Sequence, residues 1–143
     1  MKAPTALIAL SYFAHLGLCA VASATTYKPP YTPNKCFGHN TDVFPSNGFF
    51  AAAGPRIWDN GASCGKCFTV RCVAAFGPGQ HCIGDPITGN GGFITVKIVE
   101  GRLGRRAADF SFSQKAGAAI YTGGGPSGGG SFRIEYNEQD QCF

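Results

Sequence analysis

Apolar and β-branched residues recur along the chain in short runs, a pattern typical of β-strands. The clearest runs are Cys67–Phe76 (CFTVRCVAAF), Phe93–Glu100 (FITVKIVE) and Phe132–Tyr136 (FRIEY). Turn-forming Gly, Pro and Asn residues separate them, as at Asn60-Gly61. The pattern predicts an all-β barrel or sandwich built from short strands.

One segment has a helical pattern instead. In Asp109–Tyr121 (DFSFSQKAGAAIY), Ser113 is a candidate N-cap, and helix-favouring alanines follow it. The proline-rich segment TTYKPPYTPNKCFG disfavours helix, so an extended lead-in is expected before the first clear strand. Thr122–Ser131 is rich in glycine and lacks the Lys-Ser/Thr of a phosphate-binding loop, so we expect a flexible surface loop there.

The N-terminal segment has the features of a secretory signal peptide. Lys2 supplies a positive charge, a mostly apolar run covers residues 6–22, and Ala22-Ser23-Ala24 is a small-x-small cleavage site. The alternative is a membrane anchor, for which an apolar run of about 17 residues is short. We therefore expect a leader over residues 1–24, one exported domain over residues 25–143, and no stable membrane insertion.

Three of the seven cysteines form a compact motif, Cys64-x-x-Cys67 followed by Cys72. The motif could be a metal knuckle, a redox dithiol or part of a disulfide framework. Loss of Cys19 with the leader would leave an even number, which favours disulfides in a small exported chain. Structural zinc needs a second close ligand pair, and a thioredoxin-like dithiol needs a helix where a strand is predicted. We predict disulfides, no metal and no cofactor, with the pairing left open by the spacing alone.

The composition argues against a nucleic-acid partner. Charged residues make up 14% of the chain and the net charge is +4, which is too small and too scattered for such a partner. The one basic cluster, GRLGRR at Gly101–Arg106, is predicted to be an exposed loop rather than a binding patch.

The order of these segments resembles the plant natriuretic peptides of the expansin-like (EG45-like domain) group, which shares the fold of family-45 endoglucanases. The most specific matches are PPYTPNKCFG and IWDNGASCG. The resemblance implies a disulfide-stapled, six-stranded double-psi β-barrel with one short helix and a polar groove on one face. It also implies three disulfides: Cys36–Cys64, Cys67–Cys142 and Cys72–Cys82.

The same resemblance bears on catalysis. Wall-active relatives carry an aspartate, the counterpart of a glycosidase general acid, at the position that aligns with Ser111. Asp109 lies two residues earlier, on the same face of a strand but about 7 Å away. Glycoside hydrolysis needs two carboxylates, and a hydroxyl at Ser111 cannot replace one of them. The carboxylates available are Asp42, Asp59, Asp85, Glu100 and Asp109. We expect no catalytic residue and no enzymatic activity.

The expected binding groove combines aromatic and polar side chains. Trp58, the only tryptophan, either packs in the core or offers a flat face to a sugar or partner. Tyr27 and Tyr31 either line the groove or fasten the lead-in to the barrel. The full predicted set is Tyr27, Tyr31, Trp58, Asp59, Glu100, Asp109 and Ser111.

The resemblance implies a secreted, monomeric signalling protein of the apoplast, without enzymatic activity. It would act through a plant cell-surface receptor on ion and water balance, with its active surface within Tyr27–Cys72. The alternatives are an expansin-like module that binds or loosens cell-wall polysaccharide, and a barwin-like defence protein.

Overall fold

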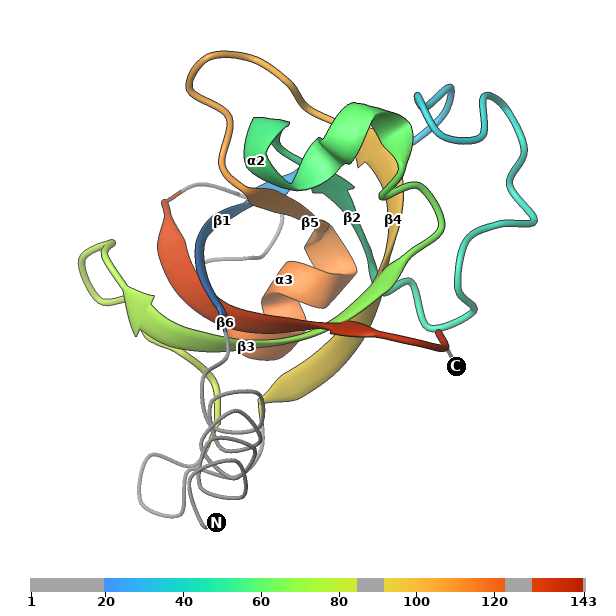
Figure 1. The fold of residues 1–143 in the computed structure, drawn as a ribbon. Helices are drawn as coiled ribbons and strands as arrows, with labels where there is room; N and C mark the ends of the chain where they lie inside the picture. Colours follow the sequence, from blue (N-terminus) through green and yellow to red (C-terminus); the bar gives the residue numbers. More distant parts are fainter. Residues whose placement is uncertain (1–19, 85–91, 123–129, 143) are drawn as a thin grey trace, which may run out of the picture.

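The computed structural model describes residues 20–84, 92–122 and 130–142. Within these residues, six strands close into a barrel in the order β1-β5-β2-β4-β3-β6 (Figure 1). This confirms the predicted six-stranded double-psi β-barrel. The strands are β1 (Ala20–Tyr27), β2 (Phe50–Ala53), β3 (Cys67–Ala75), β4 (Phe93–Gly101), β5 (Phe110–Ser113) and β6 (Phe132–Gln139).

The barrel interior is filled by alternate residues of these strands. Phe110 and Phe112 of β5 are fully buried and stack with ring centroids 5.9 Å apart, and Phe112 stacks on Phe132 of β6. Side chains of a strand alternate between its two faces. Ser111, the residue between Phe110 and Phe112, therefore lies on the outer face of β5.

The helix predicted within Asp109–Tyr121, with Ser113 as its N-cap, is confirmed. Residues 110–113 form β5, and α3 follows over Gln114–Ile120. The predicted cap is present, since the Ser113 hydroxyl oxygen accepts a hydrogen bond from the Ala116 N–H at 3.1 Å. The alternation of phenylalanine and serine before the cap is a strand pattern, and pairing with β1 and β2 fixes it.

Strand β1 begins inside the predicted leader. Residues 20–24 pair with β6, from Ala20 opposite Tyr136 to Ala24 opposite Phe132, and Ala22 and Ala24 are buried in the core. A run of small apolar residues is typical of a leader, so the local pattern did not indicate a strand there. Cleavage after Ala24 stays a prediction; it would remove every β1 residue that pairs with β6.

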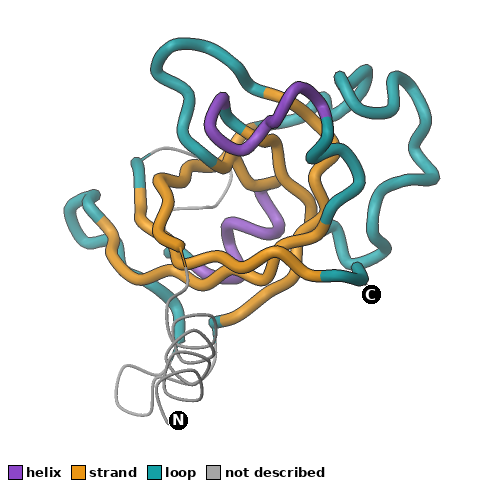
Figure 2. Tube along the Cα trace, viewed as in Figure 1, coloured by secondary structure: helices purple, strands orange, loops and turns teal. Residues whose placement is uncertain are grey.

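The three disulfides have the predicted partners. Cys36–Cys64, Cys67–Cys142 and Cys72–Cys82 have Cα–Cα distances of 5.3, 5.1 and 5.3 Å. The first fastens the long loop between β1 and β2, which extends outside the barrel in Figure 2. The disulfide between Cys67 and Cys142 joins the start of β3 to the segment just after β6.

Between β2 and β3 the chain forms more helix than expected. Where the sequence predicted turns, the short helix α2 (Pro55–Trp58) is followed by a 3-10 turn, η1 (Asp59–Gly61). Asp59 and Asn60 both have a left-handed backbone, with φ of 50° and 52°. Most of the Gly-rich segment, residues 123–129, lies outside the described residues.

Candidate binding groove

Four neighbouring strands present one continuous row of residues on the outer face of the barrel. Thr25 of β1 lies opposite Ser111 of β5, Ser111 opposite Ala52 of β2, and Ala52 opposite Glu100 of β4. Ser111 is therefore central to this row.

A groove of about 510 Å³ lies over one end of the row. Its floor includes Thr25, Thr26 and Ser111, and its wall is the loop that follows β4. The loop contributes Arg102, Gly104, Arg106, Ala107 and Ala108. Of the predicted site residues, Ser111 alone is among these lining residues, whereas both threonines and both arginines were missed.

Gly54 allows this loop to approach the barrel. Its N–H donates a hydrogen bond to the Asp109 carbonyl oxygen at 2.8 Å. A Cβ atom at Gly54 would lie 2.0 Å from the Ala108 carbonyl oxygen, closer than any real contact. The wall of the groove therefore depends on Gly54, which is close to the loop in space but distant in sequence. The sequence of the loop alone does not show this dependence.

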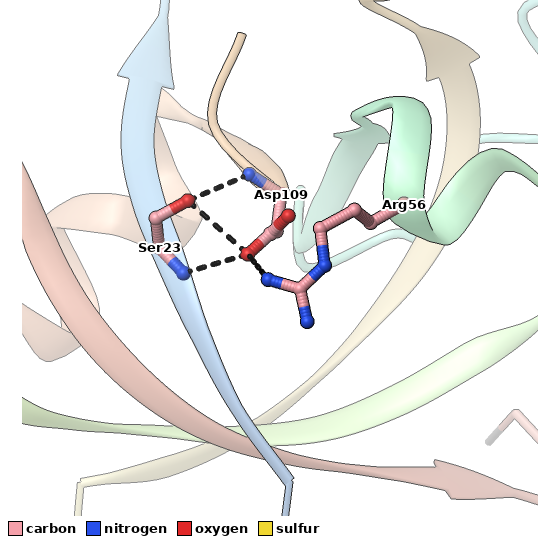
Figure 3. Close-up of polar contacts among 3 residues, drawn as sticks. All are labelled: Ser23, Arg56 and Asp109. Carbon is pink, nitrogen blue, oxygen red and sulfur yellow. Dashed lines mark hydrogen bonds and ion pairs between the residues drawn. The ribbon is translucent and has the colours of Figure 1, made fainter.

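The Asp109 carboxylate forms hydrogen bonds with Ser23 and an ion pair with Arg56 (Figure 3). Its Oδ2 accepts hydrogen bonds from the Ser23 N–H at 3.0 Å and the Ser23 hydroxyl at 3.2 Å, and forms an ion pair with Arg56 at 3.1 Å. The Asp109 side chain is 9% exposed, whereas that of Arg56 is 72% exposed. Asp109 directly precedes β5 and does not line the groove.

The other predicted carboxylates are also removed from the groove. Glu100 Oε1 accepts hydrogen bonds from the Lys35 N–H at 2.8 Å and the Gly101 N–H at 2.9 Å, which ties the β1–β2 loop to the end of β4. Asp42, in the β1–β2 loop, and Asp59, the first residue of η1, are exposed. Asp85 lies outside the described residues. No carboxylate within the described part of the chain lines the groove.

Tyr31 fastens the lead-in to the barrel, one of the two roles considered for it. Its hydroxyl donates a hydrogen bond to the Tyr27 carbonyl oxygen and accepts one from the Gln114 N–H, each at 3.1 Å. Its ring packs edge-on against Tyr27 and Phe50. The tyrosine therefore joins the end of β1 to the start of α3.

Tyr27 supports the groove wall from beneath. The Arg102 guanidinium lies 5.5 Å from the centre of the Tyr27 ring, within cation–π range. The Tyr27 hydroxyl is buried and has no hydrogen-bond partner among the described residues. Burial, and then the nearby Glu100 carboxylate, raise the pKa of this phenol above its ordinary value, while Arg102 opposes the shift.

Trp58 is half-buried and packs against the barrel core. Its six-membered ring covers Gly101, where an added Cβ would lie 2.8 Å from Cζ3. Trp58 therefore has a packing role, and the adjacent Asp59 is exposed.

The described residues show neither a membrane span nor a metal cluster. In them, no helix is long and apolar enough to cross a membrane. Nor does this part of the chain bring together three or more His, Cys, Asp or Glu side chains that could hold a metal ion.

The barrel with its outer groove is the fold of the expansins. A solved structure of apo expansin from Clavibacter michiganensis superposes with a TM-score of 0.58 at 16% identity, covering 88% of this chain. A mutant of that expansin, solved in complex with cellohexaose, gives a TM-score of 0.54 at 18% identity. This chain spans about half of the expansin chain, 53% in both comparisons.

Sequence comparison narrows the class to a family. An EG45-like domain containing protein from Citrus jambhiri is 33% identical over 131 residues, which cover 86% of this chain and 90% of the relative. A second such protein, from Arabidopsis thaliana, is 34% identical over 117 residues, or 81% of each chain. No protein-family model matches the chain. The chain belongs to the EG45-like domain containing proteins of the expansin-like group, as the sequence predicted.

Proposed function

We propose that this protein is secreted and binds cell-wall polysaccharide through the groove without hydrolysing it. The observation that carries the proposal is the composition of the floor, where Ser111 occupies the aligned position of the general acid and threonine hydroxyls lie beside it. The expansin solved with cellohexaose shares the fold, which supports a glycan as the ligand.

The groove chemistry suits binding better than bond cleavage. Thr25 and Thr26 are half-buried and carry hydroxyls of the kind that bond to sugar hydroxyls, although the Thr25 hydroxyl also donates to the Gly130 carbonyl oxygen at 3.4 Å. Ser111 is 2% exposed and forms the buried base of the groove. Cleavage would require a group that protonates the leaving oxygen and a second carboxylate. Ser111 cannot supply that proton, and Asp109 and Glu100 are held by other donors.

Two measurements on pure protein test this function. Affinity electrophoresis or calorimetry with soluble wall glycans should show binding, and an assay for reducing ends should show no turnover. Sustained release of reducing ends that is lost in Asp109→Ala or Glu100→Ala would show that the protein is a glycosidase and would contradict the proposed function. Absence of binding to every wall glycan would refute the function.

The β1–β2 loop favours a second candidate, the hormone-like signalling predicted from the sequence. This exposed loop is held in place by the Cys36–Cys64 disulfide and by the hydrogen bond from Lys35 to Glu100. Ordered loops are common binding surfaces. Swelling of plant protoplasts by the protein, lost in His39→Ala with Asp59→Ala but kept in Ser111→Ala, would favour this candidate. Trp58 is unsuited to that test, because its removal disturbs packing on Gly101.

A further inference from the structure

We propose that the groove selects acidic polysaccharides, chains of uronic-acid sugars, over neutral glucans. This inference rests on the proposed glycan binding and adds the charge of the ligand. It follows from the basic cluster Gly101–Arg106, which the sequence alone presented as an ordinary exposed loop.

The structure places two arginines of this cluster on the groove wall. Arg102 and Arg106 line the groove, whereas Arg105, in the same loop, does not. All three side chains belong to exposed residues. Of the described carboxylates, none forms an ion pair with Arg102 or Arg106; the ion pairs present are Arg56–Asp109, Lys66–Glu138 and Arg71–Glu135.

The positive charge of the wall is not balanced by the floor. Thr25, Thr26 and Ser111 are neutral, and Glu100 does not line the groove. A carboxylate at Ser111 would offset one arginine, so the hydroxyl there has an electrostatic consequence as well as a catalytic one. The described lining is therefore cationic, with hydroxyls beside the arginines.

A uronate chain matches both features. Each sugar carries a carboxylate, which the planar guanidinium fork can bind with two parallel hydrogen bonds. The Tyr27 ring holds Arg102 in position, which reduces the freedom lost on binding. The described lining contains no aromatic ring, so it lacks the stacking surface on which single-stranded nucleic acids are bound.

The test compares polygalacturonate with the same polymer after complete methyl esterification, which neutralises its carboxylates and keeps its backbone. Calorimetry should show binding to polygalacturonate that weakens as salt is added. Esterification should lower the affinity about tenfold, the equivalent of about 1.4 kcal/mol. Arg102→Gln and Arg106→Gln should each lower the affinity for polygalacturonate about fivefold, the upper range for an exposed ion pair.

Arg105→Gln is the matched control, because it removes the same charge from the same loop outside the groove. Its affinity should change less than about twofold. An equal loss in Arg105→Gln would overturn the inference, since it would indicate attraction by overall charge. Tighter binding of polyphosphate with the same arginine dependence would overturn the uronate assignment.

The failure of the inference can be told apart from the failure of the proposed function. Equal affinity for the free and esterified polymers, unchanged in both groove variants, would overturn acidic selectivity and leave glycan binding intact. If neither polymer nor cellohexaose binds the folded protein, both proposals fall. Circular dichroism of each variant confirms that the barrel is folded before binding is compared.

Discussion

In a chain that retains residues 20–24, replacing Ser23 with alanine should destabilise the barrel, because this hydroxyl has two roles at once; cleavage after Ala24 would remove Ser23 altogether. It accepts a hydrogen bond from the Asp109 N–H at 3.0 Å and donates one to the Asp109 carboxylate at 3.2 Å. Asp109 is 6% exposed, but Ser23 is exposed, so water can replace part of the lost bonding. The Ser23 N–H and Arg56 would still contact the carboxylate in the variant.

The magnitude follows from the two lost bonds. A neutral hydrogen bond contributes about 0.5–1.5 kcal/mol net, and one to a charged group about 1.5–3 kcal/mol. Partial compensation by Arg56 places the expected loss near the lower end, at about 2–3 kcal/mol. For a domain of this size each kcal/mol corresponds to about 3–4 °C, so the melting temperature should fall by about 6–12 °C.

The assay is urea denaturation of disulfide-bonded protein secreted from a eukaryotic host, with the mature N-terminus determined by intact mass. Ser131→Ala is the control, since that serine is exposed and its hydroxyl forms no hydrogen bond in the described structure; it should change stability by less than about 0.5 kcal/mol. A mature chain that retains Ser23 but is insensitive to Ser23→Ala would refute the placement of β1. So would a stably folded mature chain that begins at Thr25.

Three further predictions address packing and the disulfides. Gly101→Ala should displace the Trp58 ring, cost about 1–3 kcal/mol and shift the fluorescence of this single tryptophan; an unchanged spectrum and stability would contradict the packing. Tyr27→Phe keeps the ring beneath Arg102 and removes a hydroxyl that has no hydrogen-bond partner, so denaturation should show equal or greater stability. A loss of stability above about 1 kcal/mol would indicate that the hydroxyl has a hydrogen-bond partner after all. Replacing both Cys67 and Cys142 by serine should lower the free energy of unfolding by about 2–5 kcal/mol. This loss should exceed that of the same change at Cys72 and Cys82, because the closed loop spans 75 residues rather than 10. Equal losses in denaturation would argue against the loop-length effect.

The parts of the fold that were predictable have strong local signals. β3, β4 and β6 are rich in β-branched or aromatic residues, and Ser113 is followed by helix-favouring alanines. This signal is weak in β2, where three of four residues are alanine, and in the first half of β1, where small residues predominate. They are stable as strands because their alanines fit against the phenylalanine-filled interior, which is a property of the assembled barrel.

The site was predictable only where the resemblance supplied an aligned position. Ser111 was located in this way, and it does line the groove. The chemical environments of Asp109 and Glu100 depend on Ser23 and Lys35, which are distant in sequence and contribute backbone N–H groups. Arg102 and Arg106 were visible as a charged cluster, but their place on the wall depends on the close approach at Gly54.

The pairing of β1 with β6 also has a consequence for how the protein folds. The first described strand of the chain completes its hydrogen bonding only with the last described strand, so barrel closure has to await synthesis of β6. Contacts this distant in sequence slow folding, typically to a range on the order of milliseconds to seconds. Until closure, β6 presents an unpaired edge to other chains. The nascent protein is therefore expected to need a chaperone most in the interval when β6 has emerged but β1 has not yet docked.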